Sequence, residues 1–313
     1  MYSVGQKSAT RDAYGAALVE FDNENLVVLD ADLSASTKTG VFKKSKPERF
    51  INCGIAEGNM MSVAAGLAAC GKTVFASSFA MFAAGRAFEQ IRNSIGYPKL
   101  NVKIGATHAG ISVGEDGATH QCLEDIALMR SIPGMVILNP ADAAEARLAV
   151  KAAIDYQGPV YLRFGRLAVP TIFDENYKFE IGRGVEIAGG NDVTIIATGL
   201  MVAHTMEARD ILAAEGINAR VINMATIKPI DREIIIKAAK ETGAIVTAEE
   251  HNVIGGLGSA VAEVLCEEYP VPMVRVGTQD VFGRSGTPAE LFEIYGLDAK
   301  TIAASAKEVM AKK

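Results

Sequence analysis

The sequence predicts an α/β protein of two three-layer domains, each built on a mainly parallel sheet. Short β-rich runs alternate with alanine-rich helical stretches along the chain, which is the pattern of parallel α/β folds. Several runs are almost unbroken in apolar residues, as expected for strands that helices cover on both faces. An irregular, charged and glycine-containing segment, residues 166–192, divides the alternation in two. A length of 313 residues suits two domains.

The first half is predicted to contain five strands with helices between them. The expected strands are Leu26–Asp30, Thr73–Ala76, Val102–Gly105, Val136–Leu138 and Val160–Phe164. The expected helices are Asn59–Ala69, Ala80–Ser94, Leu123–Ser131 and Ala141–Tyr156. Asp142, just after Asn139-Pro140, is a helix-start signal for the last of these.

The second half repeats this alternation. The expected strands are Val193–Ala197, Arg220–Asn223, Ala244–Thr247 and Met273–Val276. The expected helices are Met201–Glu215, Asp231–Glu241, Gly258–Glu267, Pro288–Tyr295 and Ala299–Met310. We therefore predict a first domain over residues 1–170, a linker over 171–190 and a second domain over 191–313.

Composition and charge exclude several classes of function. A net charge of −6 without an arginine-lysine stripe argues against nucleic-acid binding. No apolar run approaches the roughly 20 residues of a membrane-spanning helix, and the polar N-terminus lacks the apolar core of a secretory signal. The four cysteines follow no CxxC or metal-ligand spacing. We expect a cytoplasmic protein that binds no membrane and whose own residues hold no metal.

Glu57 lies in the string NCGIAEGN, at a predicted turn from strand to helix. A carboxylate in the first turn of a helix can simply complement the helix dipole, and this is the commoner role. A catalytic role is the alternative. The choice between these two roles depends on the other polar segments of the same domain.

The loop THAGISVGEDGATHQ, residues 107–121, is the densest group of polar and special residues. It follows a buried-looking strand and carries His108, Asp116 and His120 together with three glycines. Loops at the carboxyl ends of parallel strands face the crevice in which α/β sheets bind ligands. A solvated glycine-rich turn is the alternative, but the convergence of these side chains in one loop favours a binding site.

Phe79 and Phe82 lie three residues apart after another predicted strand. Aromatic residues at this spacing usually belong to the core, although a flat pair beside a site could also stack on a heterocycle. The generic motifs are absent from the sequence: it contains no GxSxG, no P-loop, no HExxH and no GxGxxG after the first strand.

Several motifs, in order, resemble the C-terminal two-thirds of transketolases. They are GIAEGN, SSFAMFAAGRAFEQIR, THAGISVGEDGATHQ, SIPGMVILNPADAAEA and GPVYLRFGR, followed by TIKPID and EEHNVIGGLGSAV in the second half. The resemblance covers nearly the whole chain. It implies a pyrimidine-binding domain of a thiamine diphosphate enzyme, followed by a transketolase C-terminal domain.

The resemblance implies four residues at the cofactor. Glu57 matches the catalytic glutamate that hydrogen-bonds the aminopyrimidine ring of thiamine diphosphate and so promotes deprotonation of the thiazolium carbon. Phe79 and Phe82 match the aromatic pocket around that ring. Asp32 matches an acid near the cofactor.

The resemblance also implies residues at the substrate, a sugar phosphate. His108 and His120 match histidines that contact sugar oxygens and take part in catalysis, and Asp116 matches a residue that binds a substrate hydroxyl. Arg163 and Ser36 match residues at the substrate phosphate, where a guanidinium fits an oxyanion.

A separate subunit is expected to complete the active site. Thiamine diphosphate enzymes hold Mg²⁺ and the diphosphate with a GDG motif and a later asparagine, and this sequence has only GEDG in a different context. We expect an N-terminal transketolase subunit to supply that domain and most of the metal ligands, in a heterotetramer with two-fold symmetry. The implied reaction is transfer of a two-carbon ketol unit from a ketose phosphate to an aldose phosphate, in the pentose phosphate pathway.

Three alternatives remain open at this stage. The β subunit of a 2-oxoacid dehydrogenase has the same two domains but typically reads HSQS in the glycine-rich loop. A deoxyxylulose-phosphate synthase is similar in this region. A catalytically silent structural partner could keep the fold, although the joint presence of Glu57, His108, Asp116, His120 and Arg163 argues against it.

Overall fold

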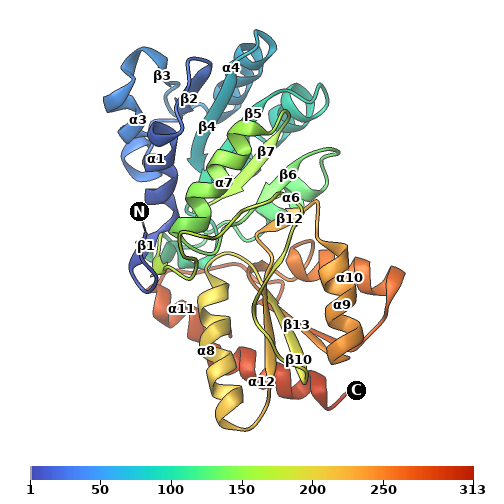
Figure 1. The fold of residues 1–313 in the computed structure, drawn as a ribbon. Helices are drawn as coiled ribbons and strands as arrows, with labels where there is room; N and C mark the ends of the chain where they lie inside the picture. The colour runs from blue at the N-terminus through green and yellow to red at the C-terminus, as the bar shows by residue number, and fades with distance from the viewer. Residues whose placement is uncertain (1) are drawn as a thin grey trace.

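Seven strands form the larger sheet of the structure, a computed structural model that describes residues 2–313 (Figure 1). Their order is β12 (Thr226–Lys228), β6 (Val136–Leu138), β7 (Val160–Arg163), β5 (Val102–Thr107), β4 (Thr73–Phe79), β2 (Leu26–Asp30) and β3 (Phe50–Asn52). Neighbouring strands are parallel except at the edge, where β12 pairs with β6 in the antiparallel sense. The central strands β2, β4 and β5 are buried along their full lengths, as their apolar sequences predict.

Helices cover both faces of this sheet. On one face α1 (Thr10–Glu20) and α7 (Ala143–Asp155) bury a core that includes Tyr14, Leu18 and Phe75. The other face carries α4 (Glu57–Ala69), α5 (Phe88–Gln90) and α6 (Asp125–Arg130), with π-helical segments η2 (Met81–Arg86) and η3 (Ile91–Gly96) on either side of α5. The remaining short helices are α2 (Ser34–Thr37), α3 (Gly40–Ser45), and the 3-10 segments η1 (Pro47–Arg49) and η4 (Ile111–Asp116).

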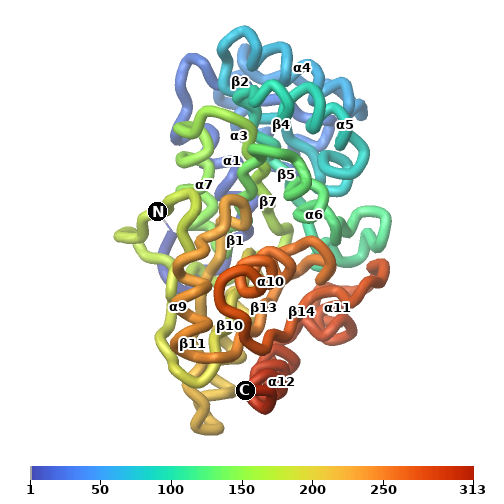
Figure 2. The backbone as a smooth tube through the Cα atoms, turned by 90° about the vertical axis from the view of Figure 1, so that its right-hand side faces the viewer, coloured from blue at the N-terminus to red at the C-terminus, as the bar shows by residue number. Residues whose placement is uncertain are grey.

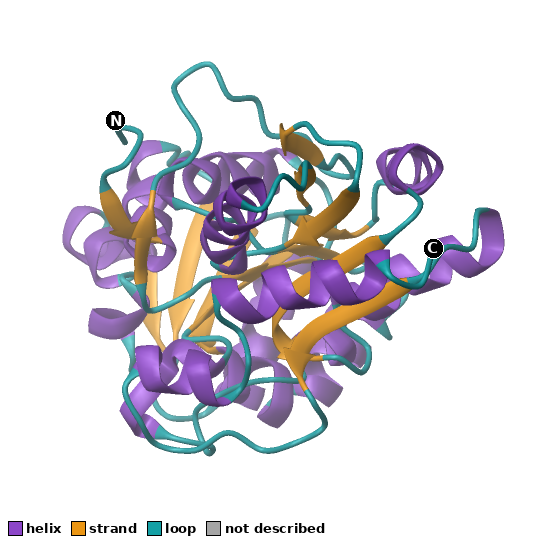
Figure 3. Ribbon diagram, turned by 90° about the horizontal axis from the view of Figure 1, so that it is seen from below, coloured by secondary structure: helices purple, strands orange, loops and turns teal. Residues whose placement is uncertain are grey.

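Five strands form the second sheet, which lies below the first in Figure 1. Their order is β14 (Met273–Thr278), β13 (Ile245–Asn252), β10 (Val193–Ala197), β11 (Ala219–Asn223) and β9 (Val185–Ala188), of which β9 alone among them is antiparallel. The helices of this unit are α8 (Met201–Ala214), α9 (Arg232–Thr242), α10 (Leu257–Glu268), α11 (Pro288–Ile294) and α12 (Ala299–Met310). Separate cores lie on the two sides of the sheet. Figure 3 shows the strands from below, with helices on either side of them. The predicted fold class, two three-layer α/β units, is confirmed.

Several helix starts follow from short capping residues. The Asp142 side chain accepts a hydrogen bond from the Glu145 backbone nitrogen at 2.8 Å, which confirms it as the N-cap of α7. Asp231 and Asp298 cap α9 and α12 in the same way. A capping box between Thr287 and Glu290 begins α11.

The structure differs from the sequence prediction in three places. The stretch expected as one helix over 80–94 is instead two π-helical segments around α5. The irregular segment after β7 contains β8 (Ala168–Pro170), which pairs with β1 (Lys7–Ala9) from the start of the chain. Finally, β12 comes from the second half of the chain but completes the first sheet, and Figure 1 shows it beside β6.

Candidate active site

The candidate residues follow the carboxyl ends of five neighbouring parallel strands. Asp32 and Ser36 follow β2, and Glu57 follows β3. The phenylalanine pair is at the end of β4, and the loop 107–121 follows β5. Of the two arginines in YLRFGR, Arg163 is the last residue of β7 and Arg166 follows the strand. Because these strands are adjacent in the order β7-β5-β4-β2-β3, their ends meet at one edge of the sheet.

Glu57 is the first residue of α4, and its side chain is 2% exposed. Both carboxylate oxygens accept hydrogen bonds from Arg86 Nη1, at 3.1 and 3.0 Å. Arg86 comes from η2, and its guanidinium lies over the Phe82 ring at 4.9 Å. Arg86 therefore links a buried carboxylate to an aromatic ring at the expected edge.

The aromatic side chains form one continuous group with the two histidines. The rings of Phe79 and Phe82 stack with centroids 6.0 Å apart, and His108 stacks on Phe79 at 3.8 Å. His120 meets Phe82 edge-on at 5.3 Å. The structure thus brings together residues from β4 and from both ends of the glycine-rich loop.

His108 is held as a neutral ring by its surroundings. Its Nε2 lies 2.8 Å from Arg11 Nη1, and a guanidinium can only donate, so Nε2 accepts. Nδ1 then carries the proton and donates to Thr107 Oγ1 at 2.9 Å. Burial, together with the nearby charges of Arg11 and Arg166, lowers the pKa of His108 to about 3. Its φ of +56° places it in the left-handed region, where backbone strain is common at functional sites.

Two arginines that the sequence analysis did not select lie at this edge. Arg11, in the first turn of α1, also donates to the Ser36 carbonyl at 3.2 Å, and burial lowers its pKa. Arg166 is half-exposed, with Nη1 3.6 Å from Asp116 and 3.7 Å from Glu115. With Ser36 and His108 they form a cationic rim. Arg166 could have been found as the second arginine of YLRFGR, whereas nothing local separates Arg11 from an ordinary helix-surface arginine.

Arg163 does not lie at the rim, and the phosphate role that was expected of it does not fit its geometry. The residue is 3% exposed. Its Nε donates to Asp125 at 2.8 Å, and its Nη2 donates to the Glu250 carbonyl at 2.9 Å. The physical reason is that Arg163 is still part of β7, so its side chain enters the junction between the two units.

Asp32 is exposed at the end of β2, with a φ of +64°. Its backbone nitrogen donates to Asn52 Oδ1 at 3.1 Å, and its carboxylate accepts from Asn52 Nδ2 at 2.9 Å. This pair ties the ends of β2 and β3 together, on the same edge as Glu57.

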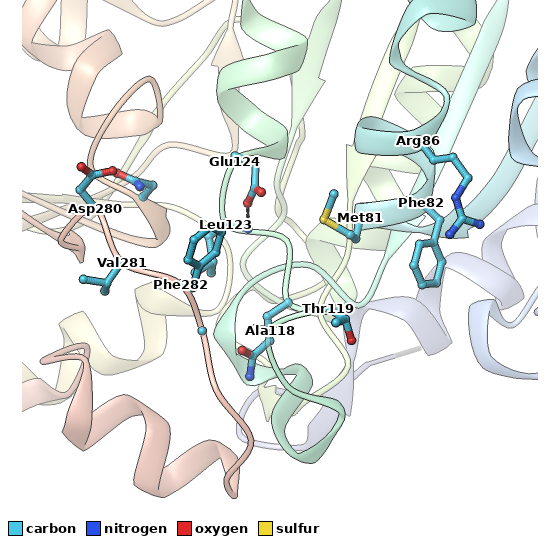
Figure 4. Close-up of a pocket in the computed structure, with 13 residues that line it drawn as sticks. Met81, Phe82, Arg86, Ala118, Thr119, Leu123, Glu124, Asp280, Val281 and Phe282 are labelled. Atoms are coloured by element: carbon cyan, nitrogen blue, oxygen red, sulfur yellow. Dashed lines mark hydrogen bonds between the residues drawn. The ribbon is translucent and has the colours of Figure 1, made fainter.

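A cavity of about 730 Å³ opens beside Phe82 and Arg86. Figure 4 shows Met81, Phe82 and Arg86 on one wall, with Val281 and Phe282 of the second unit opposite. Phe282 is 88% exposed, so a large apolar side chain faces outward at the mouth of the cavity. Figure 2 shows this side of the molecule, where the segment before α11 approaches the loops of the first sheet.

Residues 2–313 contain no group of three or more His, Cys, Asp and Glu side chains arranged to hold a metal ion. Within the same range, no helix has both the length and the apolar character needed to cross a bilayer.

Two family domains match the chain. Residues 6–171 match the transketolase pyrimidine-binding domain, and residues 182–302 match the transketolase C-terminal domain. A structure described as a split-gene transketolase in an inactive β4 tetramer has a TM-score of 0.91 and 59% identity. That match covers 97% of this chain and 98% of the other.

Curated relatives agree with these matches. A transketolase C-terminal section from Methanocaldococcus jannaschii is 53% identical, covering 98% of each chain. A subunit of a 6-deoxy-6-sulfo-D-fructose transketolase from a Clostridium species is 45% identical, covering 97% of this chain and 95% of the relative. Human transketolase is 38% identical and matches 99% of this chain, which spans 50% of its length. The chain belongs to the transketolase family and corresponds to the C-terminal section of its split form.

Proposed function

We propose that this chain is the cofactor-activating subunit of a thiamine diphosphate-dependent transketolase. The reaction is transfer of a two-carbon ketol unit from a ketose phosphate to an aldose phosphate. The observation that carries the proposal is the buried carboxylate of Glu57, which Arg86 links to the Phe82 ring at the strand edge that also carries both histidines. Residues 1–170 act as the pyrimidine-binding domain, 171–190 as the linker and 191–313 as the C-terminal domain.

The side chains present fit the pyrimidine end of the cofactor. Phe82 lies on the wall of an open cavity and offers a flat face, and Glu57 offers a carboxylate that is hydrogen-bonded to Arg86 on the same wall. When bound, thiamine diphosphate supplies the electron sink for cleavage of the carbon–carbon bond. Glu57 would accept and return a proton at the ring nitrogen, a task for which a glutamine has no ionisable group. Arg86 must give up at least one Glu57 oxygen for that contact to form.

The cationic rim fits the anionic end of the sugar. We assign the phosphate contact to Arg11, Arg166 and Ser36. Arg163 is not included because its guanidinium is buried and donates to Asp125. His108 and His120 would orient the sugar oxygens, with His108 held in position by Arg11 and Thr107, and Asp116 would bind a hydroxyl. Relatives named for 6-deoxy-6-sulfo-D-fructose and for apulose 4-phosphate support an anionic sugar as the substrate. Phosphorylated sugars of the pentose phosphate pathway are our choice for this chain.

A partner subunit would complete the site. The names of the relatives support this, since several are subunits or sections of a transketolase. We propose that an N-terminal subunit supplies the diphosphate-binding domain and most ligands to Mg²⁺ or another divalent cation. Two such pairs form a heterotetramer in the cytoplasm. The transketolase names of these relatives favour this reaction over that of a 2-oxoacid dehydrogenase or a deoxyxylulose-phosphate synthase.

Reconstitution with the partner tests the proposal. The purified chain alone should show no ketol transfer, and the mixture with the partner and cofactor should be active. In that mixture, Glu57→Gln should lower kcat by at least about 100-fold, the scale of a lost proton-transfer group, while assembly survives.

The matched control is Glu233→Gln, which removes an exposed first-turn carboxylate from α9. It should leave the rate unchanged. Robust activity of the isolated chain would refute the need for a partner. An unchanged rate in Glu57→Gln would mean that Glu57 only complements the dipole of its helix.

A further inference from the structure

The glycine-rich loop of the active site is held from the second domain by Glu250. This residue lies in β13 and is 3% exposed. Its Oε2 accepts a hydrogen bond from the Ser112 backbone nitrogen at 2.9 Å, across the domain junction. Ser112 lies between His108 and His120, so the carboxylate contacts the segment that joins the two site histidines.

Gly110 shows how closely the carboxylate fits the loop. A Cβ atom added at Gly110 would lie 2.0 Å from Glu250 Oε1, and the φ of Gly110 is +84°. Both the backbone conformation and the space therefore require glycine. The carboxyl group of the second domain occupies the place that a side chain of the loop would otherwise fill.

Gln121 makes a second attachment at the far end of the loop. Its Nε2 donates to the Ile111 and Gly114 carbonyls at 3.2 and 3.1 Å, and to the Arg284 carbonyl of the second domain at 3.0 Å. A Cβ added at Gly283 would meet Gln121 Oε1 at 1.8 Å. The loop is thus attached to the second domain at Ser112 and at Gln121.

The junction also fixes Glu250 itself. The Arg163 guanidinium donates to the Glu250 carbonyl at 2.9 Å and pairs with Asp125 at 2.8 Å. Burial raises the pKa of Glu250 to about 7, and the Arg163 charge opposes that rise. A buried carboxylate held in this way has a defined position, whereas a loop with glycines at 110, 114 and 117 has little rigidity of its own.

We propose that Glu250 is a positioning residue for the sugar site: through the Ser112 hydrogen bond, the C-terminal domain holds the loop that carries His108, Asp116 and His120. The proposal rests on the proposed function for its kinetic consequence. Glu57 and Phe82 come from α4 and η2, not from this loop, so loss of the restraint should affect sugar binding more than cofactor binding.

Two substitutions at Glu250 separate positioning from packing. Glu250→Ala removes the acceptor and leaves the Ser112 nitrogen buried without a partner, so the KM for the donor sugar should rise by about tenfold, the scale of one buried hydrogen bond. Half-saturation by cofactor should stay the same. Glu250→Gln keeps an oxygen that can accept the hydrogen bond and should restore a KM near that of the wild type.

The control is Glu145→Ala, a change at another buried carboxylate of the domain junction. Glu145 accepts from Asn223 Nδ2 at 2.8 Å and from Tyr177 Oη at 2.6 Å, and has no hydrogen bond to the loop. This variant should lower the melting temperature without raising the KM. An equal rise of KM in Glu145→Ala, or no rescue by Glu250→Gln, would overturn the proposal in favour of general stability of the junction.

Hydrogen exchange in the chain without its partner tests the same idea without any activity. Amides of residues 111–120 should exchange faster in Glu250→Ala than in the wild type, Glu250→Gln or Glu145→Ala. Equal exchange in all four proteins would refute the positioning role. If the exchange result holds but the reconstituted enzyme transfers no ketol unit, the proposed function fails and the restraint on the loop stands.

Discussion

Replacing Arg163 by methionine should unfold the protein at a much lower temperature. The guanidinium lies between Asp125, which is fully buried, and the Glu250 carbonyl. Without it, Asp125 keeps the Tyr161 hydroxyl at 2.8 Å but loses the opposite charge. Breaking a buried ion pair by removing one partner costs about 3–5 kcal/mol. At roughly 2–4 °C per kcal/mol for a unit of 150–250 residues, the melting temperature should fall by about 6–20 °C.

Arg166→Met is the matched comparison, three residues away in the same motif. Its side chain is 39% exposed and lies 3.6 Å or more from two exposed carboxylates. Such pairs contribute about 0–1 kcal/mol, so the melting temperature should fall by less than about 4 °C. If Arg166 binds the sugar phosphate, the KM of the reconstituted enzyme for the donor should rise instead.

Thermal unfolding by circular dichroism and steady-state kinetics with the partner distinguish the two arginines. Adding Asp125→Asn to Arg163→Met removes the uncompensated charge while keeping an acceptor for Tyr161, and should recover part of the lost stability. A normal melting temperature with a raised donor KM in Arg163→Met would refute this reasoning. That result would favour Arg163 as the residue that binds the sugar phosphate.

Two further predictions concern Glu145 and the aromatic pair. Burial raises the pKa of Glu145 from 4.5 to about 7, so its ionisation in the folded state costs stability. Relative to Glu145→Gln, the wild type should therefore lose stability as pH rises from about 4.5 to about 7. The melting temperatures of the two proteins, measured from pH 4 to 8, check this. A constant difference between them over that range would contradict it. Phe82→Ala should raise the cofactor concentration for half-saturation by up to about tenfold with little change in melting temperature. Phe79→Ala, at a buried ring, should cost about 3–5 kcal/mol of stability; equal effects of the two changes on stability would argue against a cofactor face at Phe82.

Local pattern was enough for most of the fold. Strands Leu26–Asp30 and Val136–Leu138 lie where the apolar runs predict them, and the Asp142 cap starts its helix. The sequence could not show β12, because three residues carry no periodicity and their partner β6 lies far away in the chain. The π-helical segments after β4 could not be predicted either, since an alanine-rich pattern predicts an ordinary α-helix.

The site was predictable where a motif lies directly at a strand end. Glu57, Phe82, His108 and His120 meet as the order of strands requires, while their chemical roles stay predictions. Arg11 reaches the rim only because α1 packs beside β5, a contact between distant segments.

The sequence could not distinguish Arg163 from Arg166 as the proposed phosphate contact, for a local reason. The choice between it and Arg166 depends on the residue at which β7 ends. Over three residues the guanidinium changes from buried at Arg163 to half-exposed at Arg166.

Because β12 follows the boundary between the two units in the chain but pairs with β6 of the first sheet, the protein cannot be truncated at that boundary. Residues 226–228 extend the first sheet beyond β6. Lys228 Nζ donates to the carbonyls of Arg130, the last residue of α6, and of Ile132 just after it, at 2.8 and 2.7 Å. A fragment that stopped in the linker would lack these partners and present β6 as an open edge, which invites pairing between copies. Exchange of whole domains among relatives would likewise have to match this strand to the foreign sheet. The two halves are therefore one unit for truncation and for recombination, although each has a sheet and cores of its own.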